Sequence, residues 1–98
     1  MVAAMVVGKC LVRLRLNGTR SLKDKRRIIQ SVLVRVCREF GVACAEVGEN
    51  DAWGRAVLGL ACVSNDGGHA RDVLRRVILW IEGNIDGEVL SSEIELIA

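Results

Sequence analysis

Apolar and polar residues alternate between positions 5 and 16, which is typical of a strand with one face in a core. The residues predicted to point inward are Val6, Cys10, Val12, Leu14 and Leu16, with Gly8 among them. Asn17-Gly18 would favour a hairpin turn on its own. A helical pattern follows it, so we expect this dipeptide to link a strand to a helix.

Between Leu22 and Phe40 the apolar positions recur every three or four residues, which predicts an amphipathic helix. The apolar stripe comprises positions 22, 28, 29, 32, 33, 36, 37 and 40. Ser21 is the predicted N-cap, because its hydroxyl can accept a hydrogen bond from the first turn. Gly41 is the predicted residue that ends the helix.

Two further alternating segments, residues 42–49 and 55–64, flank the polar connector Glu-Asn-Asp-Ala-Trp-Gly and predict a hairpin. In the first strand we expect Ala43, Ala45 and Val47 to face inward, leaving Val42, Cys44 and Glu46 outside. In the second strand the predicted inward residues are Ala56, Leu58, Leu60 and Cys62.

The last third of the chain predicts a second helix and a final strand. The helical stripe is Ala70, Val73, Leu74, Val77, Ile78 and Ile81, and Gly83-Asn84 stops it. In the strand at 88–97, the predicted inward residues are Leu90, Ile94 and Leu96, and the outward ones are Val89, Ser91, Glu93 and Glu95.

The resulting order is β-α-β-β-α-β, in which each helix connects two parallel strands. Right-handed crossovers place both helices on the same face of the sheet. We therefore predict an α+β, ferredoxin-like sandwich that forms a single domain over residues 1–98. Its four-stranded antiparallel sheet has the expected order 88–97, 5–16, 55–64, 42–49, and one sheet face is bare.

The composition agrees with a small soluble domain. The chain has 98 residues, half of them apolar, and no proline. The N-terminal segment Met-Val-Ala-Ala-Met-Val-Val is short, lacks a basic flank and is followed by Lys9. We expect neither a signal peptide nor a membrane span, and hence a cytoplasmic protein.

The four cysteines are Cys10, Cys37, Cys44 and Cys62, and no two of them form a Cys-x-x-Cys pair. Metal sites made of cysteine and histidine need closely spaced ligands. We therefore interpret the cysteines as small buried apolar residues in a reducing compartment. No metal and no cofactor is expected.

The charge is divided unevenly along the chain. Residues 1–38 hold ten basic residues and one acid, a net charge of +9, whereas residues 39–98 hold four basic and eleven acidic residues, a net charge of −7. Such a chain can steer an anionic partner to one side, or it can pair its two halves in the fold.

The cations gather at the start of the first helix, where the helix dipole disfavours them by about 0.3–1 kcal/mol each. The candidate phosphate-binding residues are Arg20, Ser21, Lys23, Lys25, Arg26 and Arg27. Free backbone N–H groups at a helix start already favour anions. Two interpretations are open: an RNA backbone binds here, or the face is solvated and partly paired with the acidic half.

The bare sheet face predicts self-association. Lys9, Arg13 and Arg15 lie on it and are expected to pair with Glu93 and Glu95 across the ladder. Its remaining residues, by the predicted alternation, are Met5, Val7, Leu11, Val42, Cys44, Val57, Ala61, Val63 and Val89. A face this apolar is unusual in water. We expect a homodimer through it.

Three aromatic residues are present, and none falls on the bare face as drawn from the pattern. Trp53, followed closely by Arg55, lies in the hairpin connector and is a candidate partner contact that could stack on a base or cover a helix end. His69, the single histidine, has no neighbouring nucleophile or ligand cluster in sequence, which favours a surface position near a helix cap.

Several segments together resemble the YlxP-like family of small bacterial proteins of unknown function. They are Ser-Leu-Lys-Asp-Lys-Arg (21–26), Ala-Glu-Val-Gly (45–48), Asp-Ala-Trp-Gly-Arg-Ala-Val-Leu-Gly (51–59) and Asn-Asp (65–66). The resemblance covers nearly the whole chain and implies a ferredoxin-like fold. Genes of this family often lie beside those of translation and ribosome-maturation factors, which has suggested RNA binding. The resemblance to this family implies no catalytic residues and no cofactor.

The leading functional hypothesis is an RNA- or ribosome-associated accessory protein that is not an enzyme. The alternative is a dimeric protein-interaction or regulatory module with no nucleic-acid role. Small acylphosphatases also carry an arginine before their first helix, but the loop Leu-Asn-Gly-Thr-Arg-Ser-Leu lacks their glycine-rich pattern. We therefore expect no turnover of acyl phosphates.

Overall fold

The order of helices and strands follows the predicted one. The computed structural model describes residues 3–98 and contains β1 (Val6–Leu16), α1 (Leu22–Phe40), β2 (Ala43–Gly48), β3 (Arg55–Ser64), α2 (Gly67–Asn84) and β4 (Gly87–Ile97). Residues 1 and 2, which the predicted apolar N-terminal segment and the predicted domain include, lie outside the described residues.

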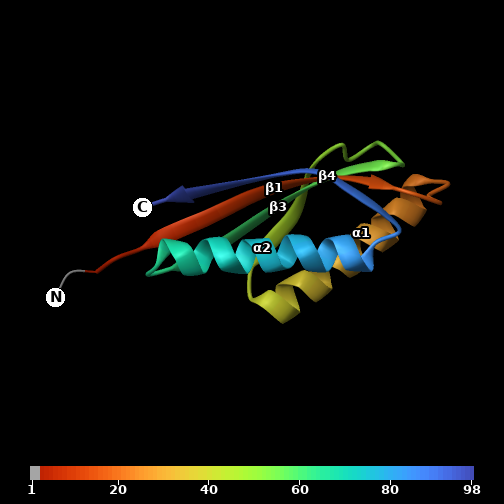
Figure 1. The fold of residues 1–98 in the computed structure, drawn as a ribbon. Helices are drawn as coiled ribbons and strands as arrows, with labels where there is room; N and C mark the ends of the chain where they lie inside the picture. Colours follow the sequence, from red (N-terminus) through yellow and green to blue (C-terminus); the bar gives the residue numbers. More distant parts are fainter. Residues whose placement is uncertain (1–2) are drawn as a thin grey trace.

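The four strands form one antiparallel sheet in the order β2-β3-β1-β4, as predicted. β1 and β3, at the centre, pair over their whole lengths, from Val6 with Ser64 to Arg15 with Arg55. Figure 1 shows α1 and α2 together on one face of this sheet, with the other face uncovered. The predicted ferredoxin-like fold is confirmed.

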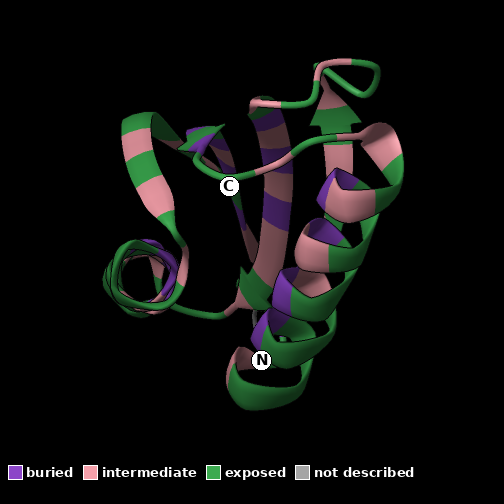
Figure 2. Cartoon of the chain, turned by 90° about the vertical axis from the view of Figure 1, so that its right-hand side faces the viewer, coloured by how far each residue is buried: buried purple, intermediate pink, exposed green. Residues whose placement is uncertain are grey.

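The core lies between the sheet and the two helices. Most of the predicted inward residues of β1, β3 and α2 are buried, while Val6, Cys62 and Val73 are half-buried. Figure 2 shows buried positions alternating along the central strands and gathered on one side of α1. The buried apolar residues are Cys10, Val12, Leu14, Leu16, Ile29, Val32, Val36, Val42, Ala56, Leu58, Leu60, Ala70, Leu74, Val77, Ile78 and Ile81.

β2 has the opposite orientation to the predicted one. Ala43, Ala45 and Val47 are exposed, whereas Cys44 and Glu46 face the helices and Val42, just before the strand, is buried. The thiol of Cys44 donates a hydrogen bond to the carbonyl oxygen of Leu33 in α1, with 3.3 Å between the atoms. The prediction was wrong because Glu46 turns inward, where it pairs with the buried Lys25 of α1.

A bulge in β4 changes which of its apolar residues face the core. Leu14 pairs with Val89 while Arg13 pairs with Ser91, so Leu90 is the extra residue of the ladder. Leu90 is exposed and Val89 packs against the core, the reverse of the prediction, whereas Ile94 and Leu96 are partly buried, consistent with their predicted inward positions. The uncovered face therefore lacks Val42, Cys44 and Val89.

Both predicted ends of α1 are confirmed. The Ser21 hydroxyl accepts a hydrogen bond from the Asp24 backbone N–H, and Gly41 adopts φ 64°, a left-handed conformation that favours glycine. Asp66 caps α2 in the same way by accepting from the His69 backbone N–H, and the His69 side chain is exposed beside this cap. Neither helix is long and apolar enough to cross a membrane within residues 3–98.

Candidate nucleic-acid interface

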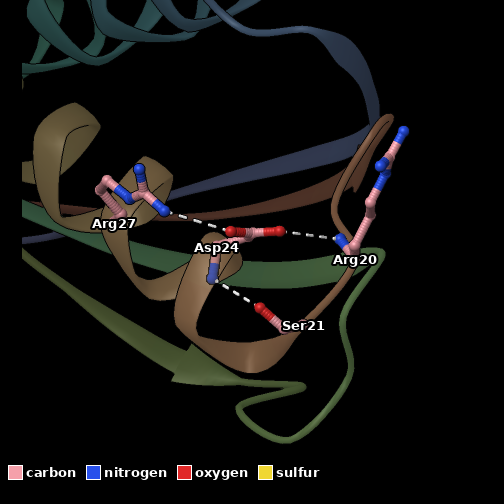
Figure 3. A network of polar contacts seen from close by, with 4 residues as sticks. All are labelled: Arg20, Ser21, Asp24 and Arg27. Carbon is pink, nitrogen blue, oxygen red and sulfur yellow. Dashed lines mark hydrogen bonds and ion pairs between the residues drawn. The ribbon is translucent and has the colours of Figure 1, made fainter.

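Asp24 and Ser21 together organise the first turn of α1. Asp24 accepts hydrogen bonds from the Arg20 backbone N–H at 3.2 Å and from the Arg27 guanidinium at 3.1 Å, while its own N–H is taken by Ser21 (Figure 3). A carboxylate at this position offsets the positive end of the helix dipole. Ser21 therefore serves as the cap, and Arg27 has a partner within the protein.

Lys25 is buried, which contradicts its prediction as a phosphate-binding residue. Its side chain is 0% exposed, and its ammonium lies 2.8 Å from a carboxylate oxygen of Glu46 in β2. It also donates a hydrogen bond to the carbonyl oxygen of Glu49 in the β2–β3 connector. Lys25 thus ties the start of α1 to the end of β2, and no phosphate group can reach it.

Three of the candidate cations, Arg20, Lys23 and Arg26, have exposed side chains. Among residues 3–98, none of the three lies within 4.0 Å of a carboxylate oxygen. The same end of the molecule carries acids in the connector and the α2–β4 loop, Glu49 and Asp86 among them, but these do not pair with the three cations. The candidate site is therefore reduced to these three positions, with Arg27 beside them.

The connector that carries Trp53 is fixed against the loop that precedes α1. The Thr19 hydroxyl donates a hydrogen bond to the Trp53 carbonyl oxygen at 2.7 Å, and the Leu16 N–H donates to the Gly54 carbonyl oxygen at 2.9 Å. Trp53 itself is 54% exposed. The fold thus holds the backbone of exposed Trp53 beside Thr19, the residue before Arg20, although Thr19 and Trp53 are 34 positions apart in sequence.

Arg55 separates from Trp53 because it begins β3. It pairs in register with Arg15 of β1, and the burial of its neighbour Ala56 places the Arg55 side chain on the uncovered sheet face. The two residues of the predicted partner contact therefore lie on different surfaces. Trp53 stays near the start of α1, whereas Arg55 belongs to the sheet.

A groove of about 970 Å³ runs from the start of α1 along the open edge of β2. Arg26, Arg27 and Arg38 stand along it, and its apolar lining includes Leu33 and Val34. Its one acid, Glu46, is already paired with Lys25. Sequence reasoning left Arg38 out of the site, although the helical spacing from Arg27 to Arg38 placed both on the solvent side.

The cations of β1 pair with acids of β4, as the strand pattern predicted. Lys9 pairs with Glu95 at 3.4 Å and Arg13 with Glu93 at 4.0 Å. Arg15 also pairs, at 3.3 Å, but with Glu88. These three pairs join the basic and acidic halves of the chain and leave the strand without free cations to offer a polyanion.

Arg35 is also engaged, by an aromatic ring. Its guanidinium lies 4.7 Å from the centroid of the Trp80 ring, and Trp80 packs edge-on against Phe40 with 6.4 Å between ring centroids. Cation–π contacts of this kind are worth about 0.5–1 kcal/mol at exposed sites. Arg35 therefore helps to join α1 to α2 and does not belong to the candidate interface.

The cysteines do not form a chemical centre. Burial raises the pKa of the Cys10 thiol and that of the half-buried Cys44 thiol, so both thiols stay protonated near neutral pH. Cys37 is exposed, contrary to the prediction that all four cysteines are buried. Within residues 3–98, no group of three or more histidine, cysteine, aspartate or glutamate residues is arranged to hold a metal ion.

Comparison with known proteins gives a family but no activity. A family model described as "Protein of unknown function (DUF503)" matches residues 7–94. The uncharacterised protein YlxP of Bacillus subtilis (strain 168) is 37% identical over 62 residues, which cover 63% of this chain and 67% of YlxP.

Two solved structures resemble the fold. The de novo designed protein Foldit4 superposes with a TM-score of 0.54 at 16% identity, over 96% of this chain and 97% of its own. SnoaB, a cofactor-independent oxygenase from Streptomyces nogalater, gives a TM-score of 0.44 at 16% identity over 98% of this chain and 93% of its own.

Proposed function

The chain belongs to the DUF503 family, whose function is unknown, and we propose that it binds RNA through the start of α1. Arg20, Lys23 and Arg26 contact backbone phosphates in this proposal, and the Trp53 indole stacks on an unpaired base. The supporting observation is the hydrogen bond from Thr19 to the Trp53 carbonyl oxygen, which holds the connector that carries the exposed Trp53 against the loop that carries Arg20.

The combination of an aromatic ring with free cations favours RNA over a simple anion. Sequence-tolerant RNA recognition uses bases splayed out of the helix and stacked on aromatic side chains, with cations along the backbone. Stacking is worth about 1–3 kcal/mol per base. The groove beside β2, with Arg27 and Arg38 along it, provides a path of suitable charge for the backbone beyond the first nucleotides.

The experiment measures binding of a fluorescent single-stranded RNA and a hairpin RNA by anisotropy. The variant Lys23→Glu with Arg26→Glu changes the charge by four units at the proposed interface, and we expect at least a tenfold loss of affinity. The matched control is Arg71→Glu with Arg75→Glu, which makes the same charge change on α2. Equal losses in both variants would mean that net charge alone drives binding, which contradicts the proposal.

Trp53 gives a second, local readout. The chain has two tryptophans, so Trp80→Phe leaves Trp53 as the only indole emitter. We expect RNA to quench its fluorescence with the same concentration dependence as the anisotropy change. Binding without any change in Trp53 emission would place the RNA elsewhere on the protein.

A further inference from the structure

The uncovered sheet face, meaning the outward residues of all four strands, is divided into two unlike halves. The β2–β3 half is made of Ala43, Ala45, Val47, Val57, Gly59, Ala61 and Val63, with Arg55 at its end. The β1–β4 half carries three ion pairs beside Leu11, Val7 and Ile97. Both helices lie on the opposite side of the sheet (Figure 1).

The uncovered face carries both a hollow and, at one end, strongly exposed apolar side chains. A hollow of about 610 Å³ is lined on one side by small residues of β2 and β3, including Ala45, Gly59 and Ala61, and on the other by β1 and β4 with the Lys9–Glu95 pair. Any larger residue at Gly59 would collide with Val47, because a Cβ there would lie 2.9 Å from the nearer Val47 methyl. Strongly exposed apolar side chains, Val63 at 67% and Met5 at 62%, stand at one end of the same face.

A two-fold axis can place the protruding end of each copy into the hollow of the other. In such an isologous contact one surface must carry both the protrusion and the recess. The uncovered face meets that requirement, because exposed Val63 of β3 lies two residues from Ala61, which lines the hollow on the same face.

The charges of this face also favour a copy of the chain over a nucleic acid. Four cations and three acids lie on it, and Lys9, Arg13 and Arg15 each pair with a glutamate of β4. Two such faces meet without strong repulsion. No aromatic side chain stands among the strand residues of this face within the described chain, so it lacks the platform on which RNA-binding sheets stack bases.

The area of the face is sufficient for a stable dimer. Strands about 4.8 Å apart and about 3.3 Å per residue give a four-stranded face of roughly 600 Å² per copy. The total of roughly 1,200 Å² exceeds the threshold of about 1,000 Å² expected for a biological interface.

We propose that a second copy of this chain covers the uncovered face in a two-fold symmetric dimer. Val63 and its apolar neighbours at one end of each copy fill the hollow lined by Ala45, Gly59 and Ala61 in the other. The start of α1 lies outside this interface, and the two proposals meet at the edge of β2, where Ala45 lines both the hollow and the groove.

The test is sedimentation velocity of the full chain from about 1 to about 200 µM, where a dimer of micromolar affinity or better is populated. We expect a species of twice 10.7 kDa for the unaltered chain. Val63→Glu should shift the dissociation constant upward by at least tenfold. Leu79→Glu, a matched control on the outer side of α2 at 66% exposure, should leave it unchanged.

A second variant addresses the hollow itself. Ala45→Arg adds a long cation at an exposed position on its lining and should weaken the dimer as strongly as Val63→Glu. Circular dichroism checks that each variant is folded. A monomer at every concentration would overturn the proposal and leave the face to another protein. A dimer that resists both variants would overturn it by showing that another surface associates.

Discussion

The cations of β1 and those at the start of α1 are the same kinds of residue in neighbouring stretches of chain, but they differ in whether a carboxylate lies close enough to pair with them. Lys9, Arg13 and Arg15 each have a glutamate partner in β4. At the start of α1, Lys25 and Arg27 are paired, while Arg20, Lys23 and Arg26 have no carboxylate within 4.0 Å among the described residues. The difference shows that a basic stretch of sequence does not by itself reveal which cations are free to bind an anion. That depends on where the fold places the acidic residues.

The two regions differ because of how each element positions its neighbours. An antiparallel ladder sets side chains of adjacent strands opposite or diagonal to one another: Lys9 lies opposite Glu95 and Arg15 opposite Glu88, while Arg13 reaches Glu93 diagonally. A helix start can be neutralised only by acids three or four positions away or by a packed segment. Here Asp24 and Glu46 are the acids that fulfil this role.

The largest expected effect concerns the buried cation. Lys25→Met leaves the Glu46 carboxylate without its partner, and breaking a buried pair from one side typically costs about 3–5 kcal/mol. Urea unfolding measures the loss. The double variant Lys25→Met with Glu46→Leu should recover most of it, because no unpaired charge then remains. A single variant within about 1 kcal/mol of the parent would show that the pair is not the tie we describe.

The second effect concerns the unpaired cations. Removing one cation that contacts phosphate should lower the salt dependence of RNA binding by about 0.7 in the slope of log affinity against log salt. We expect this for Lys23→Ala and for Arg26→Ala separately. The measurement is anisotropy at several salt concentrations, and an unchanged slope for both would remove these residues from the interface.

The third effect distinguishes the role of Asp24 in stabilising the start of α1 from its role as the ion-pair partner of Arg27. Asp24→Ala should destabilise the protein by about 0.5–2 kcal/mol, because it removes the hydrogen bond from the Arg20 N–H and the favourable charge at the helix start. It should also tighten RNA binding, because the Arg27 guanidinium loses its intramolecular partner. Ser21→Ala is the control, since it removes a cap hydrogen bond but leaves Arg27 paired. Thermal unfolding and anisotropy report the two effects, and tightening by both variants would contradict this assignment.

The smallest effect belongs to the sheet. Arg13→Ala removes an exposed ion pair at 4.0 Å, and pairs of this kind contribute about 0.2–1 kcal/mol. RNA affinity should not change. A clear loss of binding would mean that the strand cations also serve the interface, and the contrast between the two regions would fail.

Much of the fold follows from periodicity and end signals. The stripe of α2, the inward residues of β1 and β3, and the ends of α1 at Ser21 and Gly41 are as predicted. Each of these rests on a long apolar repeat or on a residue with a specific backbone role. Long repeats average out single exceptions, and the order of the strands then follows from the handedness of the crossovers.

The errors lie where a pattern is short or a polar residue is buried. In β2 apolar residues occupy both faces, so alternation does not fix the orientation of the strand, and Glu46 faces inward to pair with Lys25. In β4 a single extra residue at Leu90 reverses the alternation on one side of the bulge. Neither a buried ion pair nor a bulge leaves a periodic signal in one sequence.

The candidate site was predictable only in part for the same reason. The basic cluster from Arg20 to Arg27 is visible in the sequence, but the burial of Lys25 depends on β2 and its connector. The neighbourhood of Trp53 and Thr19 likewise depends on a hydrogen bond across the fold. Sequence spacing gives the residue types of a surface, whereas long-range packing decides which of them reach solvent together.

The hydrogen bond from Lys25 to Glu49 has a consequence for any ligand that touches both α1 and the Trp53 loop. Glu49 adopts φ 57°, so a charged donor fixes an unusual backbone conformation at the root of that loop. The two contact surfaces are therefore held in register before a ligand arrives, and binding needs little further ordering of the chain. Such preorganisation slows release more than it speeds capture, which makes residence time the quantity most sensitive to this clamp.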